Sequence, residues 1–335
     1  MVLPNMGRIS QLVLFAISLM AVSCGQGGNG SASTTHAASG YRAAEITALG
    51  TGSAGLSIND SGAITGYRTV KGTKQAIVYS GGVATEAAPG YAYSAAFSTD
   101  QANRAAGELD APRQKAFIAH DGMVELVNLP QALMSSARAV NGNGLSAGFF
   151  YDGSSYQGFV KNDSGIEAVG IPGQHVFIND INIAGHAAGH MEAGGSFHAI
   201  LYRNGTIFDI GTLGGQYSSL SSINDSGDAA GTSELGDGTY RAFIYDGSMK
   251  DLGAGDGVES GANSINNIGQ AVGWIRLTDG SQRGFLYDKG ATVDLNTLAS
   301  SPCKITDALD INNRGEISAV CGTDDGTRVV LLTPY

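Results

Sequence analysis

The sequence predicts an all-β protein, a seven-bladed β-propeller with four strands in each blade. One motif carries most of this prediction: a hydrophobic residue, Asn, two turn residues and Gly, with a second Gly four places on. Its copies begin at Ile58, Thr99, Val140, Ile181, Ile223, Ile265 and Ile311. The spacings of 41, 41, 41, 42, 42 and 46 residues match the length of one propeller blade. The last copy is also incomplete, and the start of the repeat region supplies its missing strand.

The composition agrees with many short strands joined by tight turns. The chain has 50 Gly, only 7 Pro and 15% charged residues, and no segment with a helical period stands out. The net charge of -11 and the lack of a Lys or Arg run argue against a surface that follows nucleic-acid phosphates. We therefore expect an acidic monomer with no nucleic-acid partner and no cofactor.

Residues 1–23 are typical of a lipoprotein signal peptide. Arg8 precedes an apolar run at residues 9–22 that is too short to span a bilayer comfortably. The run ends in Ala21-Val22-Ser23-Cys24, which resembles the bacterial lipoprotein signal, although Ala21 stands where Leu is usual. The resemblance implies that Cys24 receives acyl chains, and these would be the only attachment to a membrane. Ordinary secretion is the alternative.

Gly25 follows Cys24 and is not Asp, which by the same resemblance favours the outer membrane or the cell surface. Residues 24–44 are rich in Gly, Ser, Thr and Ala, and we expect them to form a flexible tether. The propeller domain is then expected to cover residues 45–335.

One copy of the repeat reads as two hairpins, with strands that we name A to D. Asn224-Asp225-Ser226-Gly227 has the chemistry of a tight turn between strands A and B, because Asn bonds the nearby backbone and Gly accepts a positive φ. Strand C is expected at residues 241–245, and Asp246-Gly247 turns the chain into strand D at residues 249–252. At the Gly position one copy has Asn103, and Asn is the next most tolerant residue of positive φ.

The two ends of the repeat region are predicted to complete one blade between them. The last copy stops after strand C at residues 328–332, and residues 45–49 resemble strand D of the sixth copy at residues 293–298. Strand C opens with a polar residue in every copy, and strand D carries an acid ten or eleven residues later in the first six. The same pairing in the seventh copy makes Glu45 the partner of Arg328, so we expect these two residues to be neighbours.

The repeat resembles a known family. The Asn and Gly positions, followed by His198-Ala199-Ile200 and then by residues 209–215 (DIGTLGG), are similar to the HAF repeat of bacterial extracellular proteins. The resemblance covers residues 45–335 and is weakest in the second copy, where Thr99-Asp100 replaces Ile-Asn. It implies an exported repeat protein and supplies no catalytic residues.

Cys303 and Cys321 flank the A to B turn of the last copy. An exported location permits a disulfide between them, and an insertion at residues 300–302 allows the two sulfurs to approach. Two buried free thiols are the alternative.

Two local patterns resemble a catalytic serine motif and a metal site, but both are better explained as parts of the repeat. Residues 144–148 (GLSAG) match a nucleophile elbow, but they form the start of a strand B, and the same Gly pair recurs in other copies without Ser. His175, His186, His190 and His198 are close in sequence, yet they occupy different positions of the repeat. We therefore predict neither a catalytic serine nor a metal site.

Binding is expected on the face of the ring that carries the B to C and D to A connections, which vary between copies. Aromatic and charged side chains gather in these loops, where tyrosines can stack on sugars or anchor a protein. The candidate ligand-binding residues are Tyr91, Tyr93, His175, Glu192, Tyr217, Asp237, Tyr240 and Asp256.

Two classes of function are compatible with these features. The first is a non-enzymatic lipoprotein of the cell surface or periplasm whose variable loops bind a glycan or a protein. The second is a propeller enzyme, a glycan hydrolase or lyase, that uses acidic residues at the channel mouth. We favour the first, because no acid is marked out by the sequence and the fold alone does not imply activity.

Overall fold

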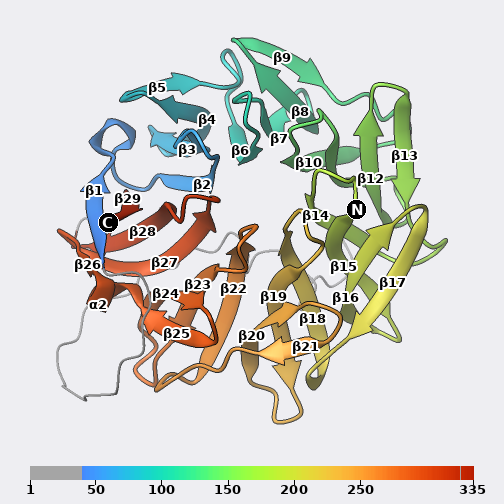
Figure 1. The fold of residues 1–335 in the computed structure, drawn as a ribbon. Helices are drawn as coiled ribbons and strands as arrows, with labels where there is room; N and C mark the ends of the chain where they lie inside the picture. Colours follow the sequence, from blue (N-terminus) through green and yellow to red (C-terminus); the bar gives the residue numbers. More distant parts are fainter. Residues whose placement is uncertain (1–39, 325) are drawn as a thin grey trace. The chain divides into compact units, whose positions relative to one another are not determined.

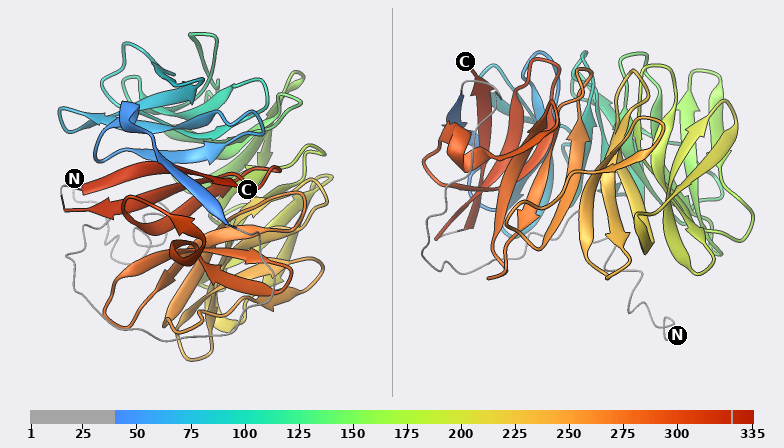
Figure 2. Two further views of the ribbon diagram at one scale, coloured as in Figure 1. Left: turned by 60° about the vertical axis from the view of Figure 1, so that its left-hand side comes forward. Right: turned by 60° about the horizontal axis from the view of Figure 1, so that its bottom comes forward.

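The computed structural model describes residues 40–335 with the exception of residue 325. These residues form seven sheets, six with four strands and one with five, arranged as blades around a central axis (Figure 1). The predicted seven-bladed β-propeller is confirmed. The views in Figure 2 show that the sheets stand side by side, so that neighbouring blades face each other across their flat sides.

The first six blades are built from consecutive strands in the order A, B, C and D. They are β2 (Ala54–Ile58), β3 (Ile64–Val70), β4 (Thr73–Ser80) and β5 (Val83–Glu86) in blade 1; β6 (Ser94–Thr99), β7 (Ala105–Asp110), β8 (Gln114–His120) and β9 (Met123–Leu126) in blade 2; β10 (Met134–Val140), β11 (Ser146–Tyr151), β12 (Tyr156–Asn162) and β13 (Gly165–Val169) in blade 3; β14 (Val176–Ile181), β15 (Ala187–Ala193), β16 (Ser196–Arg203) and β17 (Thr206–Gly211) in blade 4; β18 (Gly214–Ile223), β19 (Ala229–Leu235), β20 (Tyr240–Tyr245) and β21 (Met249–Asp251) in blade 5; and β22 (Glu259–Ile265), β23 (Ala271–Arg276), β24 (Gln282–Asp288) and β25 (Ala291–Asp294) in blade 6.

Blade 7 joins the two ends of the propeller. Its strands are β27 (Lys304–Ile311), β28 (Ile317–Thr323), β29 (Gly326–Pro334) and the N-terminal strand β1 (Tyr41–Glu45), with the short β26 (Ala299–Ser300) parallel to β1. β1 pairs antiparallel with β29, from Tyr41 opposite Pro334 to Glu45 opposite Val330. The predicted closure of the ring by the N-terminal strand is therefore confirmed, and Arg328 Nη1 lies 2.9 Å from Glu45 Oε1.

The closing strand begins earlier than the sequence predicts. Residues 41–44 belong to β1 and not to the tether, and Tyr41 is only 2% exposed because it packs into the core of blades 6 and 7. Residues 47–49 form a short 3-10 helix rather than a strand, and their counterparts in copy six form the helical turn α2 (Leu295–Leu298). Glu45 is the last residue of β1, and Asp294 is the last residue of β25. The predicted alignment of these two copies is therefore correct, but the residues that follow form helical turns and not the strand that we predicted.

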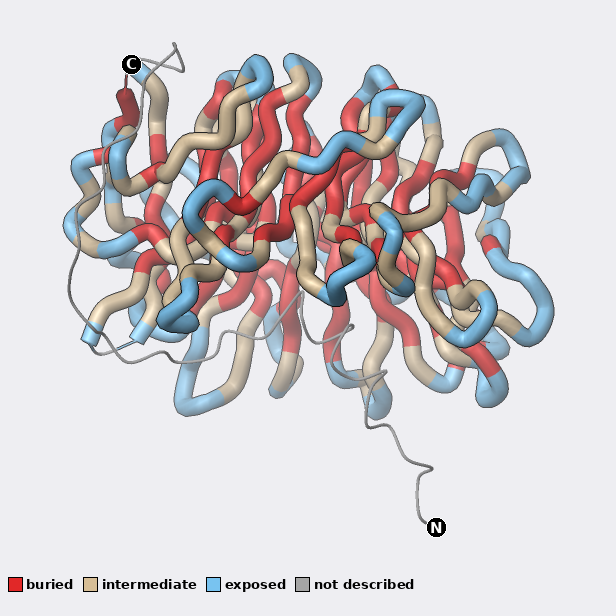
Figure 3. Tube along the Cα trace, turned by 90° about the horizontal axis from the view of Figure 1, so that it is seen from below, coloured by how far each residue is buried: buried red, intermediate tan, exposed pale blue. Residues whose placement is uncertain are grey.

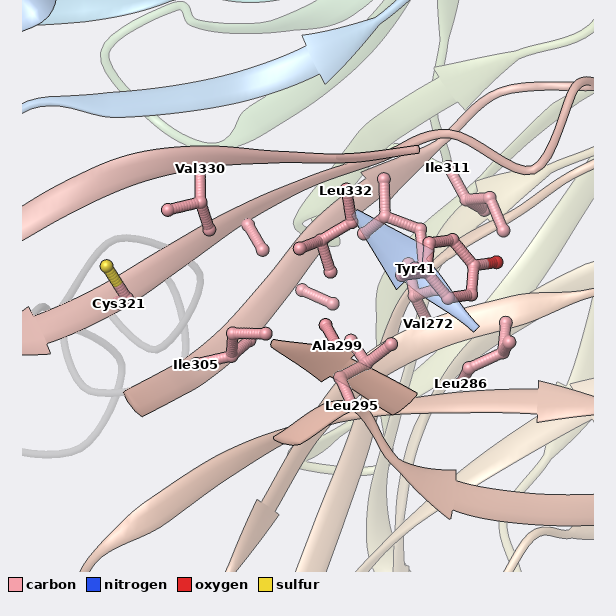
Figure 4. Packing of buried hydrophobic residues seen from close by; sticks show 13 residues of the cluster. Tyr41, Val272, Leu286, Leu295, Ala299, Ile305, Ile311, Cys321, Val330 and Leu332 are labelled. Atoms are coloured by element: carbon pink, nitrogen blue, oxygen red, sulfur yellow. The ribbon is translucent and has the colours of Figure 1, made fainter. Parts of the chain in front are cut away.

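The core is divided among the spaces between neighbouring blades. Buried residues occupy the middle of strands A to C, and exposed residues lie in the turns, in the loops and on the outer strands D (Figure 3). Figure 4 shows the hydrophobic cluster at the ring closure. Tyr41 and Leu332 of blade 7 pack there with Val272 and Leu286 of blade 6, beside Leu295. Because this cluster unites both ends of the propeller, loss of β1 would expose it.

The A to B turns have the predicted conformation. The Gly position has φ between 75° and 89° in six copies, and Asn103 has φ 60° in the remaining one. In the last blade, a disulfide joins Cys303 and Cys321, whose Cα atoms are 5.6 Å apart.

The predicted pairing of strand C with strand D occurs in only part of the ring. His198 Nδ1 lies 2.9 Å from Asp209, and Arg283 lies 3.4 Å from Asp294, as the pattern predicts. Glu125, however, pairs with Lys161 of the next blade, and Glu86 pairs with Arg68 of strand B. A long side chain reaches across to a neighbouring strand or blade, which the spacing along one hairpin does not reveal.

The signal peptide and Cys24 lie outside the described residues. Within the part of the chain that the structure describes, no helix has the length and apolar character needed to cross a membrane.

Candidate functional site

The Asn of the repeat motif links each blade to the next. Asn224 Nδ2 donates a hydrogen bond of 3.1 Å to the backbone oxygen of Asn266, and equivalent bonds start at Asn59, Asn141, Asn182, Asn266 and Asn312. The bond from Asn312 reaches Asn59 and so crosses the closure. In blade 2, Asp100 replaces Asn and has no amide to donate. Arg104 pairs with Asp100 and donates to the oxygen of Asn141 instead, which completes the ring.

Each strand A contains a bulge with one extra residue, and β18 and β27 have a second register shift closer to the start of the strand. The pairing of strand A with strand B shifts by one residue in every blade, as at Arg138 between Ala137 and Ala139. Such a bulge turns one side chain out of the regular alternation. The residues at these bulges line the central channel, and we name them the bulge ring: Leu56, Phe97, Arg138, Asn179, Ser221, Asn263 and Leu309.

A cavity of about 290 Å³ lies at the centre of the ring, between the bulge ring and the A to B turns. We name the side with the A to B and C to D turns the turn face, and the side with the B to C and D to A connections the loop face. None of the eight ligand-binding residues predicted from the sequence lines this cavity, because they lie on the loop face. The innermost strands and the Asn ring form its wall.

Three acids in and beside the channel, Asp180, Asp307 and Asp310, have raised pKa values, and each is held by hydrogen bonds to a neighbouring blade. Burial raises the pKa of Asp180 to about 6 and that of Asp307 to about 7, and it also raises the pKa of Asp310. Asp180 accepts from the backbone N–H of Ile223 in the next blade, and Asp310 accepts from that of Ile58. In other blades Ser takes this clamping position, as in Ser57. The raised pKa values therefore reflect buried clamps between blades.

The loop face of blades 3 and 4 carries a continuous group of rings. We name it the aromatic cluster; its members are Phe149, Tyr151, Tyr156, His175, Phe177, His190 and Phe197. The buried ring of Phe177 is central, with its centroid 4.9 Å from that of Tyr156, 4.8 Å from His190 and 5.1 Å from Phe149. Tyr151, Tyr156 and Phe197 are only partly buried. The buried ring of Phe177 thus supports the rings of Tyr156 and Phe197, which remain partly exposed to solvent.

His175 is fixed at the edge of this cluster. Its Nδ1 accepts a 3.0 Å hydrogen bond from the backbone N–H of Tyr156, so in the neutral ring the proton is on Nε2. Nε2 lies 3.9 Å from Glu192 Oε2, and Glu192 is tied to the same place by a backbone bond to the oxygen of His175. The two predicted residues His175 and Glu192 are therefore brought together.

The predicted residues of blades 5 and 6 have separate surroundings. Tyr217 and Tyr240 lie near each other, and burial, followed by the charge of Glu234, raises the pKa of Tyr240. Asp237 accepts from the hydroxyl and N–H of Thr239 within its own turn, while Asp256 forms an ion pair with Arg283. These two acids have local structural partners.

Blade 2 holds the remaining two predicted residues. Tyr91 packs against the core between blades 1 and 2. The Tyr93 hydroxyl donates to Glu108 at 2.8 Å, and burial, together with that carboxylate, raises the pKa of Tyr93. Glu108 also accepts from Gln114 at 2.5 Å, so this group is largely satisfied within the protein.

The residues described by the structure contain no group of three or more His, Cys, Asp or Glu side chains placed to hold a metal ion. His190 lies in the aromatic cluster and His198 pairs with Asp209, so the histidines are dispersed. Ser146, the predicted non-catalytic serine, is the first residue of β11 and is buried.

Sequence reasoning found His175 but missed the other members of the aromatic cluster. A usable signal was present: Tyr151 and Tyr156 bracket one B to C loop, and Phe177 follows His175 by two residues. The cluster combines strands of two blades, so its continuity appears only after neighbouring blades are packed together.

No family model matches the chain, and no curated protein matches it. Solved structures do match. YCF48 from Cyanidioschyzon merolae has 12% identity and a TM-score of 0.53, with 89% of this chain and 99% of that chain covered. YCF48 bound to D1 peptide has 12% identity and a TM-score of 0.51, with coverages of 88% and 95%. TolB from Acinetobacter baumannii has 12% identity and a TM-score of 0.49 over 81% of this chain.

The chain spans 63% of the length of that TolB structure, which is less than two thirds. At these identities the likeness to YCF48 shows the propeller fold alone. The resemblance to the HAF repeat stays a prediction from the residues.

Proposed function

We propose that this protein is a non-enzymatic binding module, exported as a lipoprotein, whose loop face binds a glycan through the aromatic cluster. The observation that carries the proposal is the continuous group of rings on blades 3 and 4, in which Phe177 supports the partly buried Tyr156 and Phe197. A sugar ring has apolar C–H faces that pack on aromatic rings and a polar edge that needs hydrogen-bond partners. His175 Nε2 and the Glu192 carboxylate supply such partners beside Tyr156.

Rigidity supports the same interpretation. Tyr156 contacts Phe149, Tyr151, His175 and Phe177, so its ring has little freedom to lose when a ligand stacks on it. Preorganised groups bind more tightly because association then costs less conformational entropy.

The alternative of a propeller enzyme finds less support. A glycan hydrolase needs one carboxylic acid and one carboxylate that can both reach the scissile bond. Asp180 and Asp310 have raised pKa values, but each accepts hydrogen bonds from two backbone amides, and Asp310 also accepts from Ser264. Release of reducing sugar from a bound glycan would restore the enzyme alternative.

A glycan array probed with the purified full chain tests the proposal. We expect a limited set of glycans to bind, and we expect Tyr156→Ala and Phe197→Ala to lose most of that binding. Phe208→Ala is the matched control, because Phe208 is 50% exposed on the outer strand β17, away from the cluster. The structure of YCF48 bound to D1 peptide shows that a propeller of this fold can hold a peptide, so a peptide array run in parallel tests a protein partner.

Anchoring by lipid is a separate part of the proposal. Cells that express the chain and are fed a labelled fatty acid should produce labelled protein, and Cys24→Ser should be unlabelled and released from the membrane fraction. An unlabelled wild-type chain would contradict the anchor and favour ordinary secretion.

A further inference from the structure

The bulge ring at the inner end of the cavity has an apolar half and a polar half. Blades 7, 1 and 2 contribute Leu309, Leu56 and Phe97 to it, and blades 3 to 6 contribute Arg138, Asn179, Ser221 and Asn263. Leu309, Leu56 and Phe97 also pack against the buried residues Ala54, Tyr67 and Ala95. The inner end of the channel is therefore apolar and firmly packed on one side and polar on the other.

Arg138 is the charged residue of the cavity wall that has no ionic partner. The acids of the wall are occupied: Asp60, Asp180, Asp225 and Asp310 accept hydrogen bonds from backbone amides of other blades, and Asp100 pairs with Arg104. In contrast, no hydrogen bond or ion pair joins Arg138 to any other residue of the described part of the chain. Its guanidinium carbon lies 3.8 Å from the ring centroid of Phe97, a cation–π contact that fixes the group in place.

The neighbours of Arg138 offer its guanidinium no hydrogen-bond acceptor, although the charge of Glu108 acts favourably on it. Glu108 acts on Arg138 from a distance, and both Glu108 oxygens already accept from Tyr93 and Gln114. His190 is neutral, because burial and then the charge of Arg138 lower its pKa to about 4. Ser219 Oγ lies 3.0 Å from His190 Nδ1, and Asn179 Nδ2 lies 3.5 Å from the same atom, so Nδ1 is best assigned as an acceptor. None of these groups accepts a hydrogen bond from the guanidinium.

We propose that the central cavity binds a small organic monocarboxylate, with its carboxylate on Arg138 and its apolar part against Phe97, Leu56 and Leu309. A planar guanidinium matches a carboxylate with two parallel hydrogen bonds. The hydroxyl of Ser221 has no hydrogen-bond partner among the described residues and faces the same cavity, where it is a second donor.

Size and charge select this ligand class. The volume of about 290 Å³ lies at the small end of the range for ligand sites. One guanidinium balances one negative charge. A dianion such as phosphate would keep a second negative charge without a cation close to Asp180 and Asp310, which repel it. The site is separate from the aromatic cluster and does not depend on glycan binding.

Calorimetric titration of the purified full chain with benzoate tests the proposal. We expect saturable binding, weaker binding of acetate because it lacks an apolar part, and at least about tenfold weaker binding of neutral benzamide. Arg138→Met should weaken benzoate binding by at least about tenfold, the loss expected for a charged hydrogen-bonding partner. Arg113→Met, at an exposed loop position, is the matched control and should leave it unchanged.

Two further measurements keep the test decisive. If Arg138→Met fails to fold, Arg138→Lys retains the charge without the planar fork and should lose part of the affinity, and Ser221→Ala should lose a smaller part. The proposal is overturned if benzoate does not bind the wild-type chain at millimolar concentration, if benzamide binds equally well, or if Arg138→Met leaves the affinity unchanged. Displacement of benzoate by equimolar phosphate would overturn the choice of a monocarboxylate.

Discussion

Replacement of Gly231 by Ala should destabilise the propeller, although alanine is a small residue. Gly231 is the second Gly of the motif, in strand β19 opposite Leu220, where the bulge at Ser221 begins. A Cβ atom at Gly231 would lie 2.0 Å from the backbone oxygen of Ser219, which is far inside van der Waals contact. The same position in the first six copies gives distances of 1.9 to 2.1 Å to the equivalent oxygen. Strand A or strand B must therefore move apart locally.

The expected cost follows from two opposing effects. Forcing an extra methyl into a packed site costs about 1–3 kcal/mol. Removing the backbone freedom of Gly from the unfolded chain returns about 0.4–1 kcal/mol. The two ranges give a net loss of about 0–2.6 kcal/mol in the free energy of unfolding, centred on about 1.3 kcal/mol, as measured by urea unfolding followed by circular dichroism.

Gly322→Ala provides the matched control. Gly322 also lies in a strand B, and a Cβ there would meet only Thr306 Cγ2, at an ordinary contact distance of 3.4 Å. This variant should be as stable as the wild type or slightly more stable. Equal stability of the Gly231→Ala and Gly322→Ala proteins would refute the steric explanation. Copy seven has Ala319 at the motif position, and there strand β27 carries a second register shift.

Two further predictions concern the contacts between blades. Asn312→Asp removes the hydrogen-bond donor to the Asn59 oxygen across the ring closure and places a carboxylate beside Glu316. The free energy of unfolding should therefore fall by about 1–3 kcal/mol. The control Asn143→Asp, at an exposed position, should change the free energy of unfolding by less than about 0.5 kcal/mol. Burial raises the pKa of Asp180 to about 6, so its contribution to stability is complete below the unfolded value near 4 and is lost as the pH rises through 6. Urea unfolding at several pH values should show a smaller loss of stability between pH 4.5 and 7.5 in Asp180→Ser than in the wild type, and parallel curves would contradict the assignment.

The architecture could be predicted from the sequence because its signals are local and repeated. A turn such as Asn224–Gly227 is determined by a few neighbouring residues, and seven copies at one spacing fix the number of blades. Ring closure followed from the same register, since Glu45 is the acid that the repeat pattern pairs with Arg328.

Features that depend on pairing between strands could not be predicted. The bulge that turns Arg138 toward the channel has no sequence signature of its own, because it arises from the register of β10 against β11. The partner of Glu125 is Lys161, from the next blade, and the ring of Phe177 joins Tyr156 of blade 3 to His190 of blade 4. Tyr41 belongs to the propeller because it fills a space between blades 6 and 7, a role that its own neighbours in sequence do not indicate.

The claim that the aromatic cluster is the binding surface is tested most directly by the glycan array with three proteins compared at equal concentration. The wild type and Phe208→Ala should bind the same glycans with the same affinity, and Tyr156→Ala should lose that binding while its thermal unfolding shows a folded propeller. Equal binding by all three proteins, or no glycan bound by the wild type, would contradict the account.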